Sequence, residues 1–172
     1  MQKRMTNLWF RLMALEYRLK SDPAAVLGTL MEAGIRTGMS VLDFGSGPGR
    51  YSLTAARIVG SKGMVYALDL HPLAVKMVAR KAEKARLSNI RTIRSDCKTG
   101  LPTGSIDTVL LYDALHDVED KKAVLKELHR VLKLKGTLYD HTLNGEPLFS
   151  LLRSNGFSLQ NETSAQFIFA KS

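Results

Sequence analysis

The segment VLDFGSGPGR, residues 41–50, constrains the fold most, because an apolar strand runs directly into three glycines at alternate positions. Glycine lets the backbone turn tightly and approach a ligand closely, since it has no Cβ. A helix beginning near Arg50 would point its first amide groups at the same place. The segment therefore predicts a strand, a tight turn and a helix that together bind a nucleotide-like ligand.

Apolar strand-like runs and helical patterns alternate along most of the chain. This alternation predicts parallel strands with right-handed crossovers, and hence an α/β three-layer sandwich. The last two runs, FSLQNE and QFIFAK, have no helix between them and predict an antiparallel hairpin. Before them we expect strands at 39–44, 64–69, 90–95, 106–112 and 136–141, and helices that include 5–19, 23–33, 72–87, 119–134 and a short one near 146–154.

The length and composition predict one globular domain, residues 1–172, with a helical lid or packing segment at 1–21 and a Rossmann-like core at 22–172. The single cysteine excludes an internal disulfide, so we expect a reducing, cytoplasmic setting. Charged residues interrupt the apolar face of the first twenty residues, which predicts neither a signal peptide nor a membrane span.

A formal net charge of +9 raises the question of a nucleic-acid partner. The basic side chains are concentrated between residues 76 and 94, where only Glu83 opposes them. No aromatic residue is interleaved there to stack on a base, which favours the solvated outer face of a helix instead. The cluster comprises Lys76, Arg80, Lys81, Lys84, Arg86, Arg91 and Arg94.

The glycine turn differs from the dinucleotide fingerprint in two ways. Arg50 stands where that fingerprint has its third glycine, and Asp43 adds a carboxylate that would repel a pyrophosphate. A cationic ligand would instead be attracted.

Two further carboxylates follow the next predicted strands. Asp69 ends the second strand, where it can accept both hydroxyls of a ribose. Asp96, with Cys97, ends the third strand, where it can accept from an exocyclic adenine amine. Taken singly, each aspartate is better explained as a turn or loop residue. Together with Asp43 they favour a site for a ribose, an adenine and a positive charge.

With these motifs the chain resembles the class I S-adenosylmethionine-dependent methyltransferases, most closely the type 11, ubiquinone/menaquinone-biosynthesis-like group. The resemblance rests on AGIRTGMSVLDFGSGPGRYS, VYALDLHP, IRSDCKTGLP, IDTVLLYDALHDVED and ELHRVLKLKGTLYD, and it covers residues 22 to the end. It implies a seven-stranded sheet in the order 3-2-1-4-5-7-6, S-adenosylmethionine as cofactor and S-adenosylhomocysteine as product. The implied cofactor-binding residues are Asp43, Phe44, Gly45, Ser46, Gly47, Gly49, Asp69, Leu70, Asp96, Cys97 and Asp113.

The sequence departs from the family pattern in two places. Leu134 and Lys135 replace a common Pro-Gly, which alters a turn, and Asp117 replaces a frequent second histidine after His116. The second departure argues against a catalytic histidine pair.

Methyl transfer from a sulfonium needs alignment of the acceptor and, for some acceptors, a base. The candidate catalytic residues are His116, Asp140 and His141, which follow the fourth and fifth strands. An equally good interpretation of His116 is a residue that only orients the cofactor loop. A divalent ion held by Asp113, Asp140 and His141 is the less favoured alternative.

The sequence thus predicts an enzyme that methylates an unidentified acceptor, with a small molecule favoured over RNA or protein. An alternative of another class is a non-catalytic cofactor-binding partner subunit. Residues 5–19 carry a helical stripe that we expect to act as a lid or to pack on the core or a dimer partner, rather than to lie on a membrane surface. The stripe consists of Leu8, Leu12, Leu15 and Leu19, with Trp9 and Met13 beside it.

Overall fold

The computed structural model describes residues 6–19, 22–112, 114–115, 118–140, 146–162 and 167–171. Within these residues, seven strands form one sheet in the order β3-β2-β1-β4-β5-β7-β6. The sheet is parallel except for β7, which pairs antiparallel with β5 and β6. The predicted strand order and the C-terminal hairpin are therefore confirmed. The strands are β1 (Ser40–Phe44), β2 (Met64–Asp69), β3 (Ile90–Arg94), β4 (Ile106–Leu111), β5 (Leu132–Asp140), β6 (Phe157–Glu162) and β7 (Phe167–Lys171).

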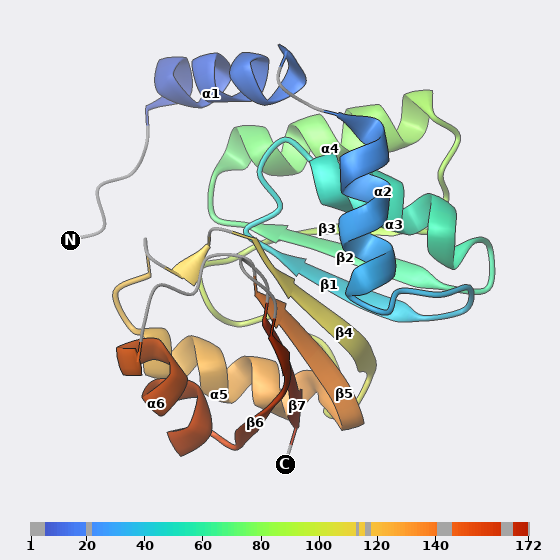
Figure 1. Cartoon of the computed structure of the whole chain (residues 1–172). Helices are drawn as coiled ribbons and strands as arrows, with labels where there is room; N and C mark the ends of the chain where they lie inside the picture. The colour runs from blue at the N-terminus through green and yellow to red at the C-terminus, as the bar shows by residue number, and fades with distance from the viewer. Residues whose placement is uncertain are drawn as a thin grey trace.

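Helices cover both faces of the sheet, which gives the predicted three layers (Figure 1). One face carries α2 (Pro23–Glu32), α3 (Arg50–Val59) and α4 (Pro72–Lys84), and the other carries α5 (Lys121–Val131) and α6 (Glu146–Ser154). Side-chain caps fix where α2 and α4 begin. Asp22 accepts a hydrogen bond from the Ala24 amide, and His71 Nδ1 accepts one from the Leu73 amide. Each cap satisfies an amide that the first helical turn leaves unpaired.

The central strands are apolar on both faces because helices bury both of them. Val41 and Leu110 pack in a cluster with residues of α2 and α3. Their chain neighbours Leu42, Val109 and Leu111 point the other way, into a cluster with α5. This double burial explains why the strands appear in the sequence as continuous apolar runs.

The fifth strand is longer than the prediction, since β5 begins at Leu132 and not at residue 136. The backbone kinks within it at Lys135, whose φ of 67° lies in the left-handed region. That conformation costs a residue with a Cβ roughly 1–2 kcal/mol. Lys135 is the residue that replaces the glycine of the family's common Pro-Gly. The β4–β5 register shifts between Ile106 and Thr108, near the amino end of both strands. The departure from the family pattern at Leu134 and Lys135 therefore falls in a kink of β5, at the edge of the sheet opposite the glycine loop.

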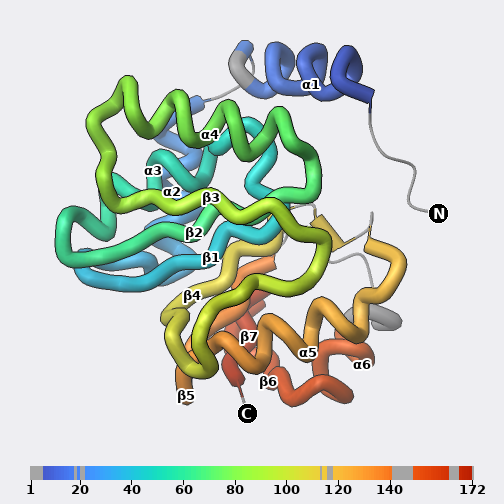
Figure 2. The backbone as a smooth tube through the Cα atoms, turned by 180° about the vertical axis from the view of Figure 1, so that it is seen from behind, coloured from blue at the N-terminus to red at the C-terminus, as the bar shows by residue number. Residues whose placement is uncertain are grey.

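The first helix, α1 (Asn7–Leu19), lies outside the layers and against α4 (Figures 1 and 2). It packs through Phe10 and Ala14, which are buried with Ala74. The leucine stripe that we expected to pack on the core is exposed instead, so that part of the prediction is wrong. The physical reason is that the aromatic ring of Phe10 and the small Ala14, four residues apart, form a closer-fitting face toward α4. In the described part of the chain, no helix is both long and apolar enough to span a bilayer.

Candidate active site

The glycine loop, residues 45–49, follows β1 at the carboxyl edge of the sheet. All three glycines have φ values between 50° and 84°, a region that residues with a Cβ seldom adopt. The amides of Gly45 and Ser46 both donate to the Leu68 carbonyl, at 2.8 and 2.9 Å, which fastens the loop to the end of β2. Lys81 of α4 donates to the Pro48 carbonyl at 2.7 Å. The loop is therefore held from two sides.

The three glycines face different surroundings. A Cβ on Gly45 would lie 2.6 Å from the Ala114 Cβ, and one on Gly49 would lie 2.8 Å from Val78 Cγ2. Among the described residues, none lies within 4 Å of a Cβ built on Gly47. Gly45 and Gly49 are therefore required by packing, whereas no described residue packs against Gly47.

Asp69 ends β2 directly beside the loop. Its Oδ2 accepts a hydrogen bond from the Gly47 amide at 2.8 Å, and its Oδ1 accepts one from the His71 amide at 2.7 Å. Burial raises the pKa of this carboxyl, while the two amides oppose the rise. Each carboxylate oxygen has a second lone pair, so the fixed carboxylate keeps the capacity to accept ribose hydroxyls.

Asp43 lies in β1 beneath the loop and is 2% exposed. The hydroxyl of Ser52 in α3 donates to its Oδ2. Burial raises the Asp43 pKa to about 6, with a further contribution from nearby Asp69, although the Ser52 hydrogen bond lowers it. A buried carboxylate beside a second carboxylate favours a cationic ligand, because the positive charge would offset the cost of burying Asp43 and its repulsion by Asp69.

The loop after β3 carries Asp96, which is exposed, and Cys97, which is half-buried. Thr99 anchors this loop to α5, since its amide and hydroxyl both donate to Glu127 Oε1. Arg130 holds Glu127 in place and, as the largest cause, lowers its pKa to about 2. Burial raises the pKa of the Cys97 thiol, and the neighbouring carboxylates raise it further. Cys97 is therefore a neutral residue that lines the loop, not a thiolate nucleophile.

Phe44 and Leu70 complete the predicted cofactor-binding residues near the loop. Phe44 ends β1 and is buried, and Leu70 follows Asp69 and is half-buried. The structure thus brings the ends of β1 and β2 together around the glycine loop, and it places the end of β3 next to β2.

Sequence reasoning assigned no site role to four residues beside the loop. Ser52, the last residue of the quoted segment AGIRTGMSVLDFGSGPGRYS, supports Asp43. Arg50, which we noted only as a departure from the dinucleotide pattern, lies with its Cζ 5.6 Å from the Tyr51 ring centroid. The Tyr51 ring stacks at 4.2 Å on that of Tyr112, just beyond β4. Among the described residues, buried Arg50 Nε and Ser46 Oγ have no hydrogen-bond partner.

Three predicted site residues, Asp113, His116 and His141, lie outside the described residues, as does Asp117, so the predicted roles of these three remain predictions. Asp140 ends β5 opposite Leu111 of β4 and is 1% exposed. It therefore lies at the same edge of the sheet as the glycine loop. Among the residues with a described placement, no group of three or more His, Cys, Asp or Glu is arranged to hold a metal ion. The alternative metal site at Asp113, Asp140 and His141 stays untested.

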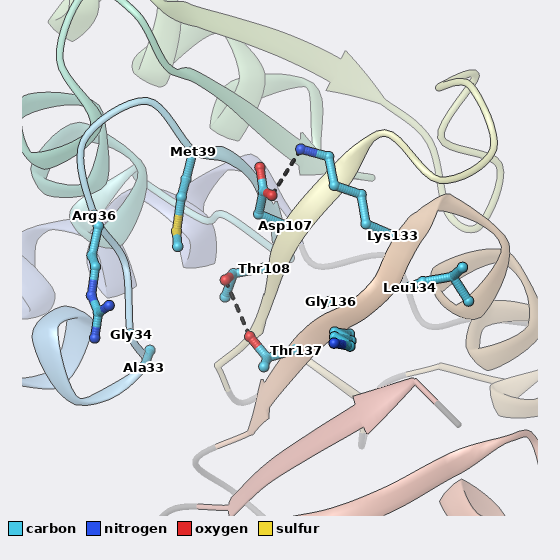
Figure 3. Close-up of a pocket in the computed structure, with 11 residues that line it drawn as sticks. Ala33, Gly34, Arg36, Met39, Asp107, Thr108, Lys133, Leu134, Gly136 and Thr137 are labelled. Carbon is cyan, nitrogen blue, oxygen red and sulfur yellow. Dashed lines mark hydrogen bonds and ion pairs between the residues drawn. The ribbon is translucent and has the colours of Figure 1, made fainter.

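A cavity lies elsewhere, near the amino ends of β1 and β4 (Figure 3). It has a volume of about 270 Å³. Thr108 and Thr137 meet in it at 3.2 Å, and Lys133 pairs with Asp107 at 2.8 Å. Because ligands of open α/β sheets bind at the carboxyl ends of strands, this cavity is not part of the candidate active site.

Comparison with known proteins agrees with this geometry. A family model described as a methyltransferase domain matches residues 35–167. The ubiquinone/menaquinone biosynthesis C-methyltransferase UbiE of Marinomonas sp. is 30% identical over 112 residues, which cover 64% of this chain and 45% of that protein. UbiE of Shewanella woodyi is 31% identical with the same coverage. The chain thus matches less than half the length of these relatives.

Solved structures share the fold. A SAM-dependent methyltransferase from Aquifex aeolicus superposes with a TM-score of 0.83 at 24% identity, covering 98% of this chain and all of that one. TrmN from Thermus thermophilus gives a TM-score of 0.72 at 24% identity over 92% of this chain and 52% of its own.

The sheet order and the glycine loop are those of a class I S-adenosylmethionine-dependent methyltransferase. The chain belongs to the methyltransferase-domain family, and the resemblance found in the sequence is confirmed. The Aquifex aeolicus structure is that of a SAM-dependent methyltransferase, so S-adenosylmethionine is the cofactor against which the site is compared.

The residues present fit that cofactor. Gly47, against which no described residue packs, donates to the fixed carboxylate of Asp69. The Ser46 hydroxyl of the same loop has no hydrogen-bond partner within the described parts of the chain. The carboxylates of Asp43 and Asp69 supply negative charge toward a cation.

Gly47→Ala is expected to weaken S-adenosylhomocysteine binding at least tenfold, because the new methyl group would enter the space assigned to the ligand. Gly104→Ala is a matched control, since Gly104 also has a left-handed φ and nothing within 4 Å of a Cβ, but lies in the turn before β4. Both variants should lose roughly 1–2 kcal/mol of stability. Calorimetric titration of both variants gives the affinities. Wild-type affinity in Gly47→Ala would show that the space is not the ligand's.

Proposed function

We propose that this chain transfers the methyl group of S-adenosylmethionine to a small-molecule acceptor and releases S-adenosylhomocysteine. The observation that carries the proposal is the glycine loop held by Asp69 through the Gly47 amide, with no described residue packed against Gly47. The relatives named as ubiquinone/menaquinone biosynthesis C-methyltransferases support a small acceptor. The single cysteine fits the cytoplasmic setting that is part of this proposal.

When bound, S-adenosylmethionine supplies an electrophilic methyl group on a positively charged sulfur. Asp69 is assigned to the ribose hydroxyls, and Asp96 with the Cys97 amide to the adenine. Gly45, Gly47 and the end of β4 are assigned to the methionine part. These roles follow the order of the strands, since β3 and β2 lie on one side of the loop and β4 on the other.

We assign Arg50 to the carboxylate of the methionine part. Its guanidinium lies over the Tyr51 ring at the start of α3, and that ring stacks on Tyr112 just beyond β4. Its buried Nε donor has no partner among the described residues. A guanidinium with an unused hydrogen-bond donor is suited to bind a carboxylate.

Arg50→Gln should therefore weaken S-adenosylhomocysteine binding roughly tenfold or more, because a charge-assisted hydrogen bond is worth about 1.5–3 kcal/mol. Binding of 5′-methylthioadenosine, which lacks the amino-acid part, should not change. Titration calorimetry with both ligands measures the difference. An equal loss for both ligands would indicate a general disturbance of the loop, and no loss for either would remove Arg50 from the site.

On the acceptor side, Asp140, His116 and His141 are our candidates to orient the acceptor or take its proton. Asp140 lies at the carboxyl end of β5, beside the end of β4. A base that acts on the acceptor affects transfer more than cofactor binding. Asp140→Asn should accordingly reduce the transfer rate while leaving S-adenosylhomocysteine affinity nearly unchanged.

The acceptor class can be found by incubating the enzyme with methyl-labelled S-adenosylmethionine and separate small-molecule, RNA and protein fractions of a cell extract. Label in the small-molecule fraction supports the proposal. Label in RNA, with affinity that falls steeply with salt, would replace it with a nucleic-acid methyltransferase. Cofactor binding without transfer to any fraction, together with a stable complex with another protein, would favour the non-catalytic partner subunit.

A further inference from the structure

The first helix presents an apolar surface that nothing in the described structure covers. We call it the leucine face; it consists of Leu8, Trp9, Leu12, Leu15 and Leu19, whose side chains are between 49% and 77% exposed. Contiguous apolar patches of this kind on soluble proteins mark sites of interaction with other molecules or with membranes.

The attachment of α1 to the body of the protein leaves this face outward. The Phe10 ring stacks on His71 with centroids 4.4 Å apart and planes 6° from parallel. Ala14 packs with Ala74, and Met13 lies against the same cluster. Figure 2 shows α1 running along the outer side of α4. The leucine face therefore lies on the side of α1 away from α4.

Exposed basic side chains outnumber the one exposed carboxylate, Glu16, on the described part of α1 and on the stretch of α4 that packs against it. Arg11 is exposed on α1, one residue from Leu12. On α4, Leu73 and Met77 pack against α1, and the exposed Lys76 and Arg80 lie beside them at helical spacing. Together with the net charge of +9, these cations are complementary to a surface of negative charge.

We propose that α1 docks the enzyme onto a negatively charged lipid surface. The leucine face enters the boundary between headgroups and acyl chains, and Arg11, Lys76 and Arg80 meet the lipid phosphates. Trp9 suits this interface, because tryptophan is enriched at the headgroup level of membranes.

A second copy of the chain fits less well as the occupant. The leucines have the 4-3-4 spacing of a coiled-coil seam, but α1 has 13 residues, which is fewer than two full heptads. Pairing two copies through α1 would also bring together two sets of basic side chains. A nucleic acid would match the charge but not the leucines.

The test uses the full chain and the fluorescence of Trp9, the single tryptophan. Vesicles of phosphatidylcholine containing phosphatidylglycerol should shift its emission to the blue and sediment the protein, and added salt should weaken both effects. Leu12→Glu/Leu15→Glu should reduce sedimentation at least tenfold. Leu134→Glu is the matched control, since Leu134 is 85% exposed in the kink of β5 and should bind as the wild type does.

A blue shift with rising protein concentration and no lipid, accompanied by a doubled mass, would overturn the proposal in favour of a second copy. The proposal would also be overturned if the wild type does not bind anionic vesicles, or if Leu12→Glu/Leu15→Glu binds them as well as Leu134→Glu does. Should the leucine variant unfold, Arg11→Glu/Lys76→Glu changes exposed residues only, and undiminished sedimentation of that variant would contradict the proposal. None of these readouts depends on the methyl donor, so the proposed function is tested separately.

Discussion

Asp69→Ala is expected to weaken S-adenosylhomocysteine binding by about 100-fold. The substitution removes the carboxylate assigned to two ribose hydroxyls, and each hydrogen bond to a charged group is worth about 1.5–3 kcal/mol. It also frees the amides of Gly47 and His71, which Asp69 fixes at 2.8 and 2.7 Å. The loop then loses the anchor that orients Gly47. Titration calorimetry at fixed pH and ionic strength measures the change.

Asp107→Ala is the matched control for this experiment. Asp107 also accepts from a backbone amide, that of Ser40 at 2.8 Å, but at the opposite edge of the sheet. It also pairs with Lys133. This variant should lose stability and keep its affinity for S-adenosylhomocysteine. Similar affinity losses in both variants would mean that Asp69 acts on binding through the fold alone.

Asp43→Asn is expected to stabilise the protein at neutral pH. A carboxyl whose pKa is raised from 3.8 to about 6 in the folded state costs roughly 3 kcal/mol when both states are ionised. The sign follows from proton binding, since the folded state holds the proton more tightly than the unfolded state. The stability of the wild type should therefore fall as pH rises from about 4 to about 6. The amide variant carries no charge and lacks this fall.

Thermal unfolding of both proteins between pH 4 and pH 8 checks this expectation. At pH 7.5 the variant should melt higher by up to roughly 5–10 °C, although its affinity for a cationic cofactor should drop. Ser52→Ala provides a second check, because losing its hydrogen bond should move the pKa of Asp43 further upward. A variant less stable than the wild type at pH 7.5 would show that Asp43 is retained for stability and not for its charge.

The sheet could be predicted from sequence because its strands are buried on both faces and appear as continuous apolar runs. Strand ends could also be predicted, since Asp43, Asp69 and the glycines stand at fixed places relative to those runs. This was enough to place most of the described cofactor-binding residues around one edge.

Contacts across the fold could not be predicted in the same way. Ser52 reaches Asp43 from α3, and Arg50 lies over Tyr51, although the motif that contains both residues does not indicate these contacts. The packing face of α1 was missed because Phe10 and Ala14 contribute less to a hydrophobic pattern than four leucines do. Which apolar face of a helix is buried depends on the shape of its neighbour. Here the small side chain of Ala74 packs with the small side chain of Ala14.

The most direct test of the central claim is thermal unfolding with S-adenosylmethionine, S-adenosylhomocysteine and NAD in parallel. A ligand at 100 times its dissociation constant adds about 2.7 kcal/mol of stability, which is roughly 5–10 °C for a domain of this size. We predict a shift of this order with both sulfur nucleotides and none with NAD. A shift with NAD alone would contradict the account, because it would mean that the glycine loop binds a dinucleotide despite Arg50 and Asp43.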